Sequence, residues 1–299
     1  MTDLRHELEK YADVVCDVPL SKLTTLRIGG IVRYVVYPEN LLSLEGILKT
    51  VEAYHLPYKL IGKGSNLLCS DEVFEGVIIR LDKHFNQFYI DGTTLVAEAG
   101  CSIITLSVEA MRNGLSGLEF ASGIPATVGG VTFMNAGAYK SAMSEVIESV
   151  SVLRDGKMEW ISNEECEFAY RSSIFQKHPD WIILGVRLQL KEGDKEEIRQ
   201  LMESRKERRM ASQPLDKASA GSIFRNPEEV PAWELIEGIG YRGKRIGGAQ
   251  VSEKHVNFIV NEDHASAKDF LQLIEEIQAK VKEKYQIDLV MEVEKFNWQ

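Results

Sequence analysis

A serine with no nearby base raises the first question about the chemistry of this chain. Ser222 lies in the segment "KASAGSIFRNP", residues 217–227, and the small residues before it let a backbone or a ligand come close. The histidine nearest to it in the sequence is His255, so the segment does not supply a base that would activate a nucleophile. The composition therefore indicates a segment built around a ligand, and it leaves the role of the serine open.

A second candidate is the glycine-rich turn "GKGSNL", residues 62–67, which follows the predicted strand "YKLIG". It has two of the three glycines of a dinucleotide-binding turn and lacks the third, which packs the helix against the strand. Its backbone N–H groups can instead converge on an anion, as in a nest. The alternative is a tight turn capped by an asparagine. A near match elsewhere, "GIGYRGKR", has Arg245 where a phosphate-binding loop requires serine or threonine, and we reject it.

Three further segments have a composition that could serve ligand binding. "EFASGIPATVGGVTFMNAGAY" (119–139) is almost free of charge, and it either packs backbone against backbone or lies along a flat, extended ligand. "YRSSIF" (170–175) and "RIGGAQVSEKHVNFIVN" (245–261) are each compatible with ordinary loops. Taken singly, Arg171 and Glu292 would by default be a surface arginine and a solvated strand glutamate, and His255 is either a hydrogen-bonded structural histidine or a base.

Composition narrows the class of protein. The chain has 299 residues, 44% hydrophobic and 27% charged, as in ordinary soluble globular proteins. Its formal net charge of −10 argues against non-specific binding to nucleic acid or to a membrane surface, although basic residues gather between 205 and 254. There is no secretory signal, no CxxC pair among four spaced cysteines, and no metal-ligand pattern. We therefore expect a cytoplasmic protein with reduced cysteines and no metal.

Hydrophobic periodicity predicts the elements that must position these segments. Strands are expected at 32–37, 58–62, 77–81, 87–90, 94–100, 149–162 around an Asp155-Gly156 turn, and 181–190 with one buried face. A last strand, 287–296, would place Ile287, Leu289, Met291 and Val293 on one face and Glu292 on the other. The pattern of the middle region is α+β.

Helices are expected between these strands. The predicted ranges are 43–55 with Ser43 as N-cap, 102–113 closed by Gly114, 194–210, and 266–285. In the third, Ile198, Leu201, Met202 and Arg205 share one side. The fourth has an apolar stripe of Phe270, Leu273, Ile274, Ile277 and Val281, and Ser266 with Asp269 resembles a capping box.

Six motifs follow one another in a fixed order along the chain. They are "TTLRIGG", "GKGSNLL", "EFASGIPATVGGVTFMNAGAY", "YRSSIF", "SAGSIFRNP" and "RIGGAQVSEKHVNFIVN". Together they resemble the UDP-N-acetylenolpyruvoylglucosamine reductases, the MurB family of peptidoglycan synthesis, over essentially the whole chain. The early motifs are similar to those of the wider class of FAD-binding domains shared with vanillyl-alcohol oxidase, and the last three point to the reductase. The length fits the shorter type of the family, which lacks an extra tyrosine-bearing loop.

The resemblance implies an α+β fold with a two-subdomain FAD-binding module of the vanillyl-alcohol-oxidase (PCMH) type and a C-terminal α+β substrate-binding domain. Residues 1–80 would form the first FAD-binding subdomain, to which the C-terminal strand 291–299 would return. Residues 81–195 would form the second, and residues 196–290 the substrate-binding domain.

The implied activity is that of a flavoenzyme with non-covalent FAD and NADPH as co-substrate. It would reduce the enolpyruvyl ether of UDP-N-acetylglucosamine enolpyruvate to UDP-N-acetylmuramate, as a monomer that binds neither nucleic acid nor membrane. Two rivals stay open. One is an oxidase of sugars or hydroxy acids from the same FAD class, and the other is a nucleotide-sugar-binding regulator that has lost its redox chemistry.

The motifs also carry over the site residues of the family. The cofactor-binding residues would be Gly62, Lys63, Gly64, Ser65, Asn66, Leu67, Ser122, Gly123, Ile124, Thr127, Gly129, Gly130, Asn135, Gly137 and Ala138. The substrate-binding residues would be Tyr170, Arg225, Asn226, Gln250, Lys254 and His255.

Three catalytic residues carry over by the same motifs: Arg171, Ser222 and Glu292. Hydride addition to the terminal carbon of an enolpyruvyl group leaves negative charge next to a carboxylate, which the guanidinium of Arg171 can stabilise. Ser222 would donate the proton to the α-carbon. A serine is a weak acid, but an enolate is a strong base, so no histidine is required. Glu292 would tune or share a proton in this network.

Some positions depart from the family pattern. Ala126 stands where glycine is common in "GIPGTVGG", and one added methyl group near the cofactor is tolerable. Met291 stands where a proline often precedes the catalytic glutamate, and "EKFN" replaces the usual basic-apolar ending. Glu294 shares the predicted strand face of Glu292, but Val293 follows Glu292 in the family's register, so we retain Glu292.

Overall fold

The computed structural model describes residues 2–298 and divides the chain into two compact units. The first unit consists of Met1–Cys16, Tyr34–Lys63 and Gly76–Glu207, and the second of Asp17–Arg33, Gly64–Glu75 and Arg208–Gln299. Each unit has its own hydrophobic core. The boundaries expected from the sequence, at 80, 195 and 290, belong to a three-part scheme that stays a prediction.

The first unit is built on a five-stranded antiparallel sheet in the order β12-β11-β13-β7-β6. Its strands are β6 (Phe88–Asp91), β7 (Thr94–Glu98), β11 (Ile147–Arg154), β12 (Lys157–Ser162) and β13 (Ile182–Gln189). The predicted hairpin between β11 and β12 is confirmed. Asp155 and Gly156 both have positive φ, +51° and +70°, as a two-residue turn of this hand requires.

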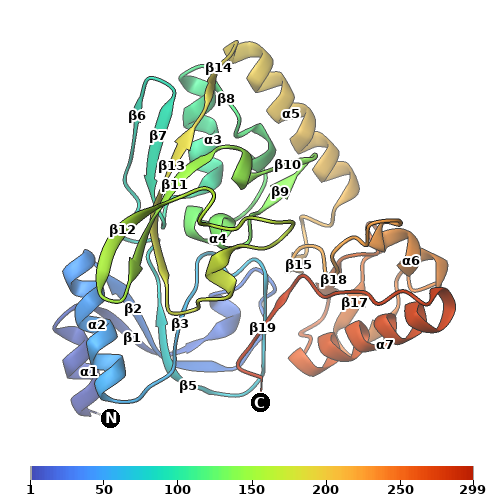
Figure 1. The fold of residues 1–299 in the computed structure, drawn as a ribbon. Helices are drawn as coiled ribbons and strands as arrows, with labels where there is room; N and C mark the ends of the chain where they lie inside the picture. The colour runs from blue at the N-terminus through green and yellow to red at the C-terminus, as the bar shows by residue number, and fades with distance from the viewer. Residues whose placement is uncertain (1, 299) are drawn as a thin grey trace. The chain divides into compact units, whose positions relative to one another are not determined.

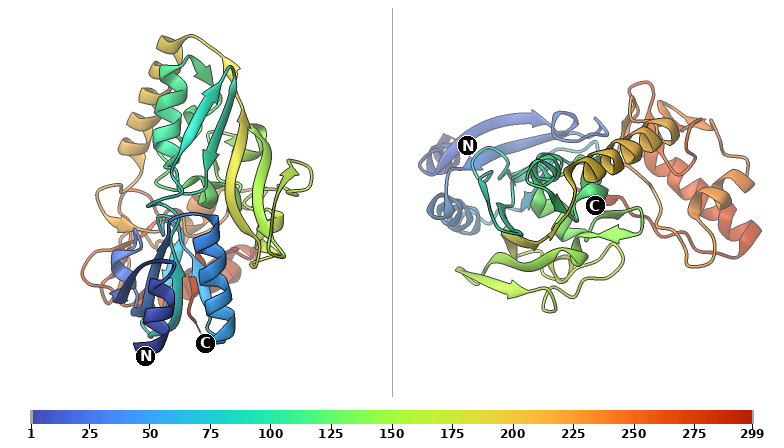
Figure 2. Two further views of the ribbon diagram at one scale, coloured as in Figure 1. Left: turned by 90° about the vertical axis from the view of Figure 1, so that its left-hand side faces the viewer. Right: turned by 90° about the horizontal axis from the view of Figure 1, so that it is seen from above.

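Helices α3 (Ile103–Arg112) and α4 (Val128–Phe133) lie on one face of this sheet (Figures 1 and 2). The face is apolar because alternate strand residues such as Leu95, Val150 and Val186 enter the core there. The predicted helix at 102–113 is confirmed. Its N-cap is Ser102, whose hydroxyl accepts the Thr105 N–H. Gly114 follows the C-cap with φ +70°.

A second sheet has the strand order β1-β2-β5-β3, with β1 (Ala12–Pro19), β2 (Ile31–Pro38), β3 (Tyr58–Leu60) and β5 (Phe74–Ile79). β3 pairs with β5 in parallel. Helices α1 (Thr2–Glu9) and α2 (Leu41–Ala53) contact each other in the first unit (Figure 1). The predicted N-cap of α2 is wrong. Asn40 caps it, and the Asn40 carboxamide accepts the Ser43 N–H, because the helix begins at Leu41, three residues before its apolar stripe starts at Leu44.

The remaining elements of the first unit are short, apart from one long helix. β8 (Leu115–Ser116) pairs with β14 (Lys191–Glu192), and β9 (Gly137–Ala138) pairs with β10 (Ser141–Ala142). Single 3₁₀ turns occur at Glu119–Ala121, Met143–Glu145 and Ile174–Gln176, and Leu20–Lys22 forms another in the second unit. Helix α5 (Lys195–Ser212) leads from the first unit into the segment that begins at Arg208.

The second unit has an antiparallel sheet in the order β15-β18-β17-β16, packed on one long helix. Its strands are β15 (Ala218–Ser219), β16 (Arg245–Ile246), β17 (Ala249–Val251) and β18 (Ile259–Asn261). Helix α7 (Ala267–Tyr285) packs on β16 and β17, with α6 (Ala232–Gly238) beside it (Figure 1). The predicted stripe of α7 is confirmed, since all five of its residues are buried.

The chain's end returns to an early segment of the same unit. β19 (Glu294–Phe296) pairs in parallel with β4 (Leu67–Cys69), and the Trp298 indole donates to the Leu68 C=O at 2.9 Å. This pairing places the residues just before β19 next to the glycine-rich turn that leads into β4. The C-terminal strand is therefore part of the framework of the candidate site.

Three predicted patterns are wrong in part. Strand β13 is buried on both faces from Ile182 to Val186, because Ile183 and Gly185 are covered as well as their neighbours. In α5, Ile198 is buried while Leu201 is 42% exposed, so the predicted four-residue face is not covered along its length. The last strand spans three residues rather than ten, although burial alternates before it as predicted.

Among the described residues, no helix combines the length and the apolar composition needed to cross a membrane. All four cysteines have free thiols. Burial raises the pKa of Cys101 to about 11 and that of Cys166 to about 12, so these two thiols stay protonated at neutral pH. Neither is therefore a candidate nucleophile.

The start of α7 provides a test of the second unit's stability. The Ser266 hydroxyl accepts the Asp269 N–H at 3.1 Å, and the Asp269 carboxylate accepts the Ser266 N–H at 3.0 Å. Ser266→Ala should lower the free energy of unfolding by about 1 kcal/mol, because the Asp269 N–H loses its acceptor. Denaturation followed by circular dichroism measures this. Lys268→Ala, at an exposed position in the same turn, is the control, and an equal loss in both variants would contradict the cap assignment.

Candidate active site

The backbone that follows Ser222 is held by hydrogen bonds from Ile223 to Arg225. Ser222 follows Gly221, whose φ of +80° is readily available only to glycine. The Ile223 N–H donates to the Asn257 C=O at 2.9 Å. The carboxamide of Asn257 then bonds both backbone groups of Phe224, accepting its N–H at 3.0 Å and donating to its C=O at 2.9 Å. The serine is thus followed by two residues whose backbone cannot move independently of Asn257.

Glu292 lies directly beside this segment in the second unit. Its N–H donates to the Ile223 C=O at 2.7 Å, and the Arg225 N–H donates to the Val290 C=O at 2.9 Å. Phe224 and Met291 form an antiparallel bridge between the two. Two predicted catalytic residues, Ser222 and Glu292, are therefore brought together by a short piece of strand pairing, although they are far apart in the sequence.

The glycine-rich turn is connected to the same place. The Asn66 carboxamide donates to the Glu292 C=O at 3.1 Å, and the Glu294 N–H donates to the Asn66 C=O at 2.9 Å. Gly64 has φ +61°, and a Cβ there would collide with the Leu23 C=O. Its own C=O accepts the Thr25 N–H at 3.2 Å. Glycine is thus required at 64 both by its backbone conformation and by close packing.

Two predicted substrate residues follow Ser222 closely. Arg225 has its Nε buried, and within the described chain that nitrogen has no hydrogen-bond partner. Asn226 is exposed, and its carboxamide oxygen accepts the Ala232 N–H at 3.1 Å, which fixes the start of α6. The side chain of Asn226 thus has a structural role in the unit, whereas Arg225 keeps an unused donor.

Three more predicted substrate residues lie in 250–255, within the same unit. Gln250 Nε2 donates to the Gly243 C=O at 3.1 Å, and Lys254 Nζ donates to the Met210 C=O. Ser252 organises the turn before His255, because its hydroxyl accepts the N–H groups of Lys254 and His255. These contacts place the three side chains around one loop.

His255 is half-buried and stacks edge-on against Phe258 with ring centroids 5.0 Å apart. Its Nδ1 accepts the Asn257 N–H at 3.3 Å. Burial lowers its pKa below the ordinary value of 6.5, and the positive charge of Arg242 lowers it further. At neutral pH the ring is therefore uncharged, and it can offer a substrate a hydrogen bond but no positive charge.

Arg171, the third predicted catalytic residue, belongs to the first unit. It has φ +55°, a left-handed conformation that is uncommon for a side chain of this size. Its Nη2 donates to the Gly137 C=O at 2.9 Å, and its guanidinium lies 5.3 Å from the centre of the Tyr170 ring. Gln176 Nε2 donates to the Arg171 C=O at 3.1 Å. A strained backbone held by several contacts is typical of functional positions.

The predicted cofactor segment 119–139 also lies in the first unit. Thr127 caps α4, and its hydroxyl accepts the Gly130 N–H at 3.3 Å. A Cβ at Gly62 would collide with the same hydroxyl, so the turn and the cap pack closely. The Val128 N–H donates to the Cys101 C=O, and the Gly129 N–H donates to the Ala99 C=O, both at 2.8 Å. The start of α4 is therefore satisfied by the protein itself.

Other predicted cofactor residues of this unit are partly committed to its structure. The carboxamide of Asn135 donates to the Ala169 C=O and accepts the Ser144 N–H, both at 2.9 Å. The Ser122 hydroxyl donates to the Glu119 C=O at 2.9 Å. Lys63 pairs with Asp82 at 3.2 Å. These side chains shape the segment, and any contact with a cofactor would be additional.

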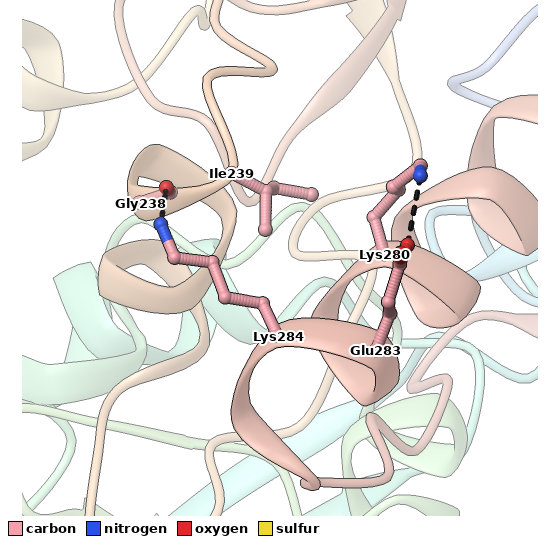
Figure 3. Close-up of a pocket in the computed structure, with 5 residues that line it drawn as sticks. All are labelled: Gly238, Ile239, Lys280, Glu283 and Lys284. Carbon is pink, nitrogen blue, oxygen red and sulfur yellow. Dashed lines mark hydrogen bonds and ion pairs between the residues drawn. The ribbon is translucent and has the colours of Figure 1, made fainter.

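A surface hollow of about 450 Å³ lies between the end of α6 and α7 (Figure 3). Gly238, Ile239, Lys280, Glu283 and Lys284 line it. Lys284 Nζ donates to the Gly238 C=O at 2.6 Å, and Lys280 pairs with Glu283 at 2.8 Å, so each charged side chain of this hollow has a partner within it. It contains no residue predicted from the sequence, and it is not the candidate site.

Asn257 was not among the residues predicted from the sequence. It lies inside the motif "RIGGAQVSEKHVNFIVN", two positions after the predicted residue His255. The available signal was a single carboxamide in an otherwise apolar run between Val256 and Val260. A buried amide must find both a donor and an acceptor, so such a residue marks a backbone that needs to be held.

Two family descriptions match the chain. An FAD binding domain matches residues 32–162, and the C-terminal domain of UDP-N-acetylenolpyruvoylglucosamine reductase matches residues 213–296. UDP-N-acetylenolpyruvoylglucosamine reductase from Bacillus subtilis (strain 168) is 43% identical over 282 residues, which cover 94% of this chain and 93% of the relative. The resemblance that the six motifs carried is confirmed.

Solved structures agree with this result. UDP-N-acetylenolpyruvylglucosamine reductase (MurB) from Thermus caldophilus has a TM-score of 0.83 at 38% identity, covering 96% of this chain and 100% of that chain. Wild-type Phl p 4.0202, a glucose dehydrogenase, has a TM-score of 0.50 at 15% identity over 64% of this chain and 44% of its own, and it shares the fold alone. The predicted α+β fold class, an FAD-binding module followed by the reductase's C-terminal domain, is confirmed.

The neutral state of His255 can be tested directly. Its ring should titrate with a midpoint below 6.5, because the buried imidazolium is disfavoured. Arg242→Gln should move the midpoint upward, whereas Arg242→Lys, which keeps the charge, should leave it low. Histidine NMR signals followed from pH 8 to 4.5 give these midpoints. Since the folded pKa lies below the unfolded one, stability should fall as the pH drops below 6.5, and a midpoint above 6.5 would contradict the assignment.

Proposed function

This chain belongs to the family of UDP-N-acetylenolpyruvoylglucosamine reductases, and from this membership we propose how it performs their reaction. It is an FAD-dependent oxidoreductase that reduces the enolpyruvyl ether of UDP-N-acetylglucosamine enolpyruvate to UDP-N-acetylmuramate, a step in making peptidoglycan. The observation that carries this conclusion is the relationship at 43% identity along 94% of the chain, with an FAD binding domain and the reductase's C-terminal domain in order.

Several finer properties belong to the same proposal. NADPH is the electron donor, FAD is bound without a covalent link, and the chain acts as a monomer in the cytoplasm without nucleic acid or membrane partners. We also propose the three-part division of labour in which residues 1–80 and 81–195 bind FAD and residues 196–290 bind the substrate. The pairing of β19 with β4 supports the return of the C-terminal strand to the first of these ranges.

The residues present fit FAD in two respects. Gly64 is buried, and neither its N–H nor that of Ser65 donates a hydrogen bond within the described chain, which leaves both donors for a phosphate oxygen. Gly62 packs closely on Thr127, so the turn lies against the segment that we propose to run along the cofactor, and a side chain at 62 would displace the threonine from it. The residues that would hold FAD are the turn 62–67 together with Ser122, Gly123, Ile124, Thr127, Gly129, Gly130, Asn135, Gly137 and Ala138.

When bound, FAD would supply the chemistry of hydride transfer to the enolpyruvyl double bond, with NADPH as the source of its electrons. After hydride addition at its terminal carbon, the substrate carries negative charge at the α-carbon and on the adjacent carboxylate. Arg171 stabilises that charge, because a guanidinium is positively charged and can form two parallel hydrogen bonds with a carboxylate. The bond from Arg171 Nη2 to the Gly137 C=O holds the group in one direction while other N–H groups of the fork bind the substrate.

Ser222 then donates its hydroxyl proton to the α-carbon, which completes addition of hydrogen across the double bond. Its hydroxyl makes no hydrogen bond within the described chain, so no acceptor of the protein competes for the proton. The rigid backbone after Ser222 supports this role, since proton transfer to carbon requires a fixed donor direction.

Glu292 shares a proton with the serine or tunes its acidity. The support for this role is the hydrogen bond from its N–H to the Ile223 C=O, which keeps the two segments adjacent. The substrate-binding residues would be Tyr170, Arg225, Asn226, Gln250, Lys254 and His255. Among them, Arg225 has the clearest capacity for an anionic group, because its buried Nε is an unused donor.

The proposed activity has a direct test. Purified protein should be yellow, should release intact FAD on denaturation, and should oxidise NADPH only when the enolpyruvyl UDP-sugar is present. Oxygen consumption with a sugar or hydroxy acid would instead support an oxidase. Binding of the UDP-sugar with no bleaching of the flavin absorbance would support a regulator. A colourless protein that cannot be reconstituted with FAD would remove the proposal altogether.

The role of Ser222 is tested by separating the two half-reactions in a stopped-flow instrument. Ser222→Ala should slow re-oxidation of the flavin by the substrate by about 10²- to 10⁴-fold, the range for loss of a positioned proton donor. Reduction by NADPH should keep its wild-type rate. Ser219→Ala is the matched control, since it removes a hydroxyl from the same segment. Equal re-oxidation rates in wild type and Ser222→Ala would take Ser222 out of the mechanism.

A further inference from the structure

Asn257 makes three hydrogen bonds with the Ser222 segment, through its backbone and its side chain. The residue is 4% exposed. Its C=O accepts the Ile223 N–H at 2.9 Å, its Oδ1 accepts the Phe224 N–H at 3.0 Å, and its Nδ2 donates to the Phe224 C=O at 2.9 Å. Three hydrogen bonds from one residue therefore fix the two residues that follow the serine.

The opposite edge of the same segment is fixed as well. The Ile223 C=O accepts the Glu292 N–H at 2.7 Å, and the Arg225 N–H donates to the Val290 C=O at 2.9 Å. From the Ile223 N–H to the Arg225 N–H, each backbone group thus has a partner in either Asn257 or 290–292. The side chains of Ile223 and Phe224 are buried at 0% and 1% exposure, which adds packing to the hydrogen bonds.

Ser222 itself stands between this fixed stretch and Gly221. Gly221 precedes it with φ +80°, and a Cβ built on Gly221 would meet nothing within 4 Å. No atom of the described chain accepts the serine hydroxyl, so the direction of that hydroxyl depends on the backbone to which it is attached. On the glycine side the backbone has open space, and on the other side it is held by Asn257.

We propose that Asn257 is the positioning residue that aims the Ser222 hydroxyl at the substrate for proton transfer. This inference rests on the function proposed above for Ser222. A carboxamide is suited to the task because it donates and accepts at once, and so satisfies both backbone groups of one residue in a buried place where neither can reach water. An error of about 1 Å in such a donor costs about 100-fold in rate.

The test measures both half-reactions in Asn257→Ala with FAD bound. Re-oxidation of the flavin by the enolpyruvyl UDP-sugar should slow by about 100-fold. Reduction by NADPH and the flavin content should stay at wild-type values. The maximal rate of re-oxidation should fall more than the half-saturating substrate concentration changes. The solvent deuterium isotope effect on re-oxidation should rise, because proton delivery becomes more limiting. Asn257→Ser is the milder variant if Asn257→Ala gives no folded protein.

Asn261→Ala is the matched control. Its carboxamide also bonds two sides of the second unit's backbone, donating to Leu26 and Arg27 and accepting the Ala265 N–H. None of these partners belongs to the Ser222 segment. We expect Asn261→Ala to lose about as much stability as Asn257→Ala but to re-oxidise at the wild-type rate. The comparison separates the effect of losing a structural carboxamide from the effect of losing the one that holds the Ser222 segment.

A double substitution decides between positioning and general support. In a Ser222→Ala background, removal of the Asn257 carboxamide should cost nothing further in re-oxidation, because the group that it positions is gone. A further loss of about 100-fold in that background would overturn the inference, as would unchanged re-oxidation in Asn257→Ala. If Ser222→Ala alone re-oxidises at the wild-type rate, it is the proposed role of Ser222 that fails.

Discussion

The hydrogen bond from the Glu292 N–H to the Ile223 C=O is the contact on which the second unit's candidate site depends. It joins two segments from opposite ends of the unit's last stretch of chain, and at 2.7 Å it is shorter than the bond of 2.9 Å from the Arg225 N–H to the Val290 C=O. Through the Asn66 carboxamide, the C=O of the same Glu292 is also tied to the glycine-rich turn. One residue's backbone therefore connects the proposed proton donor, the proposed acidic partner and the turn proposed to bind phosphate.

Asparagine recurs at these connections for a physical reason. Asn66, Asn257 and Asn261 each bond backbone groups that lie outside the regular strand ladders. A carboxamide carries a donor and an acceptor on one short, neutral side chain, so it can stand in for a strand neighbour where no strand is present. It also avoids the cost of burying a charge. The backbone around the candidate site is thereby irregular but fixed. A regular strand ladder there would use the backbone N–H and C=O groups that a ligand could otherwise bind.

Periodicity in the sequence predicted the elements that depend on local pattern alone. The stripe and capping box of α7, the end of α3 at Gly114 and the Asp155-Gly156 hairpin are confirmed, because each follows from spacing within a few residues. The α5 face was wrong because an amphipathic pattern does not say whether another element covers it, and Leu201 stays exposed. Motif order predicted the candidate site residues, but Asn257 was missed since its partners lie more than thirty positions away.

The stretch before β19 shows what such a pattern does report. Leu289 and Val293 are buried while Val290 is 55% exposed, as a two-residue period requires. Yet β19 begins only at Glu294, and 290–292 meets its neighbour through a single bridge. Alternation therefore indicates an extended chain with one face against a core, but it does not predict the hydrogen-bond partners of the backbone. In this stretch they go to 223 and 225, on either side of Phe224, which is why the end of the chain and the segment after Ser222 form one wall.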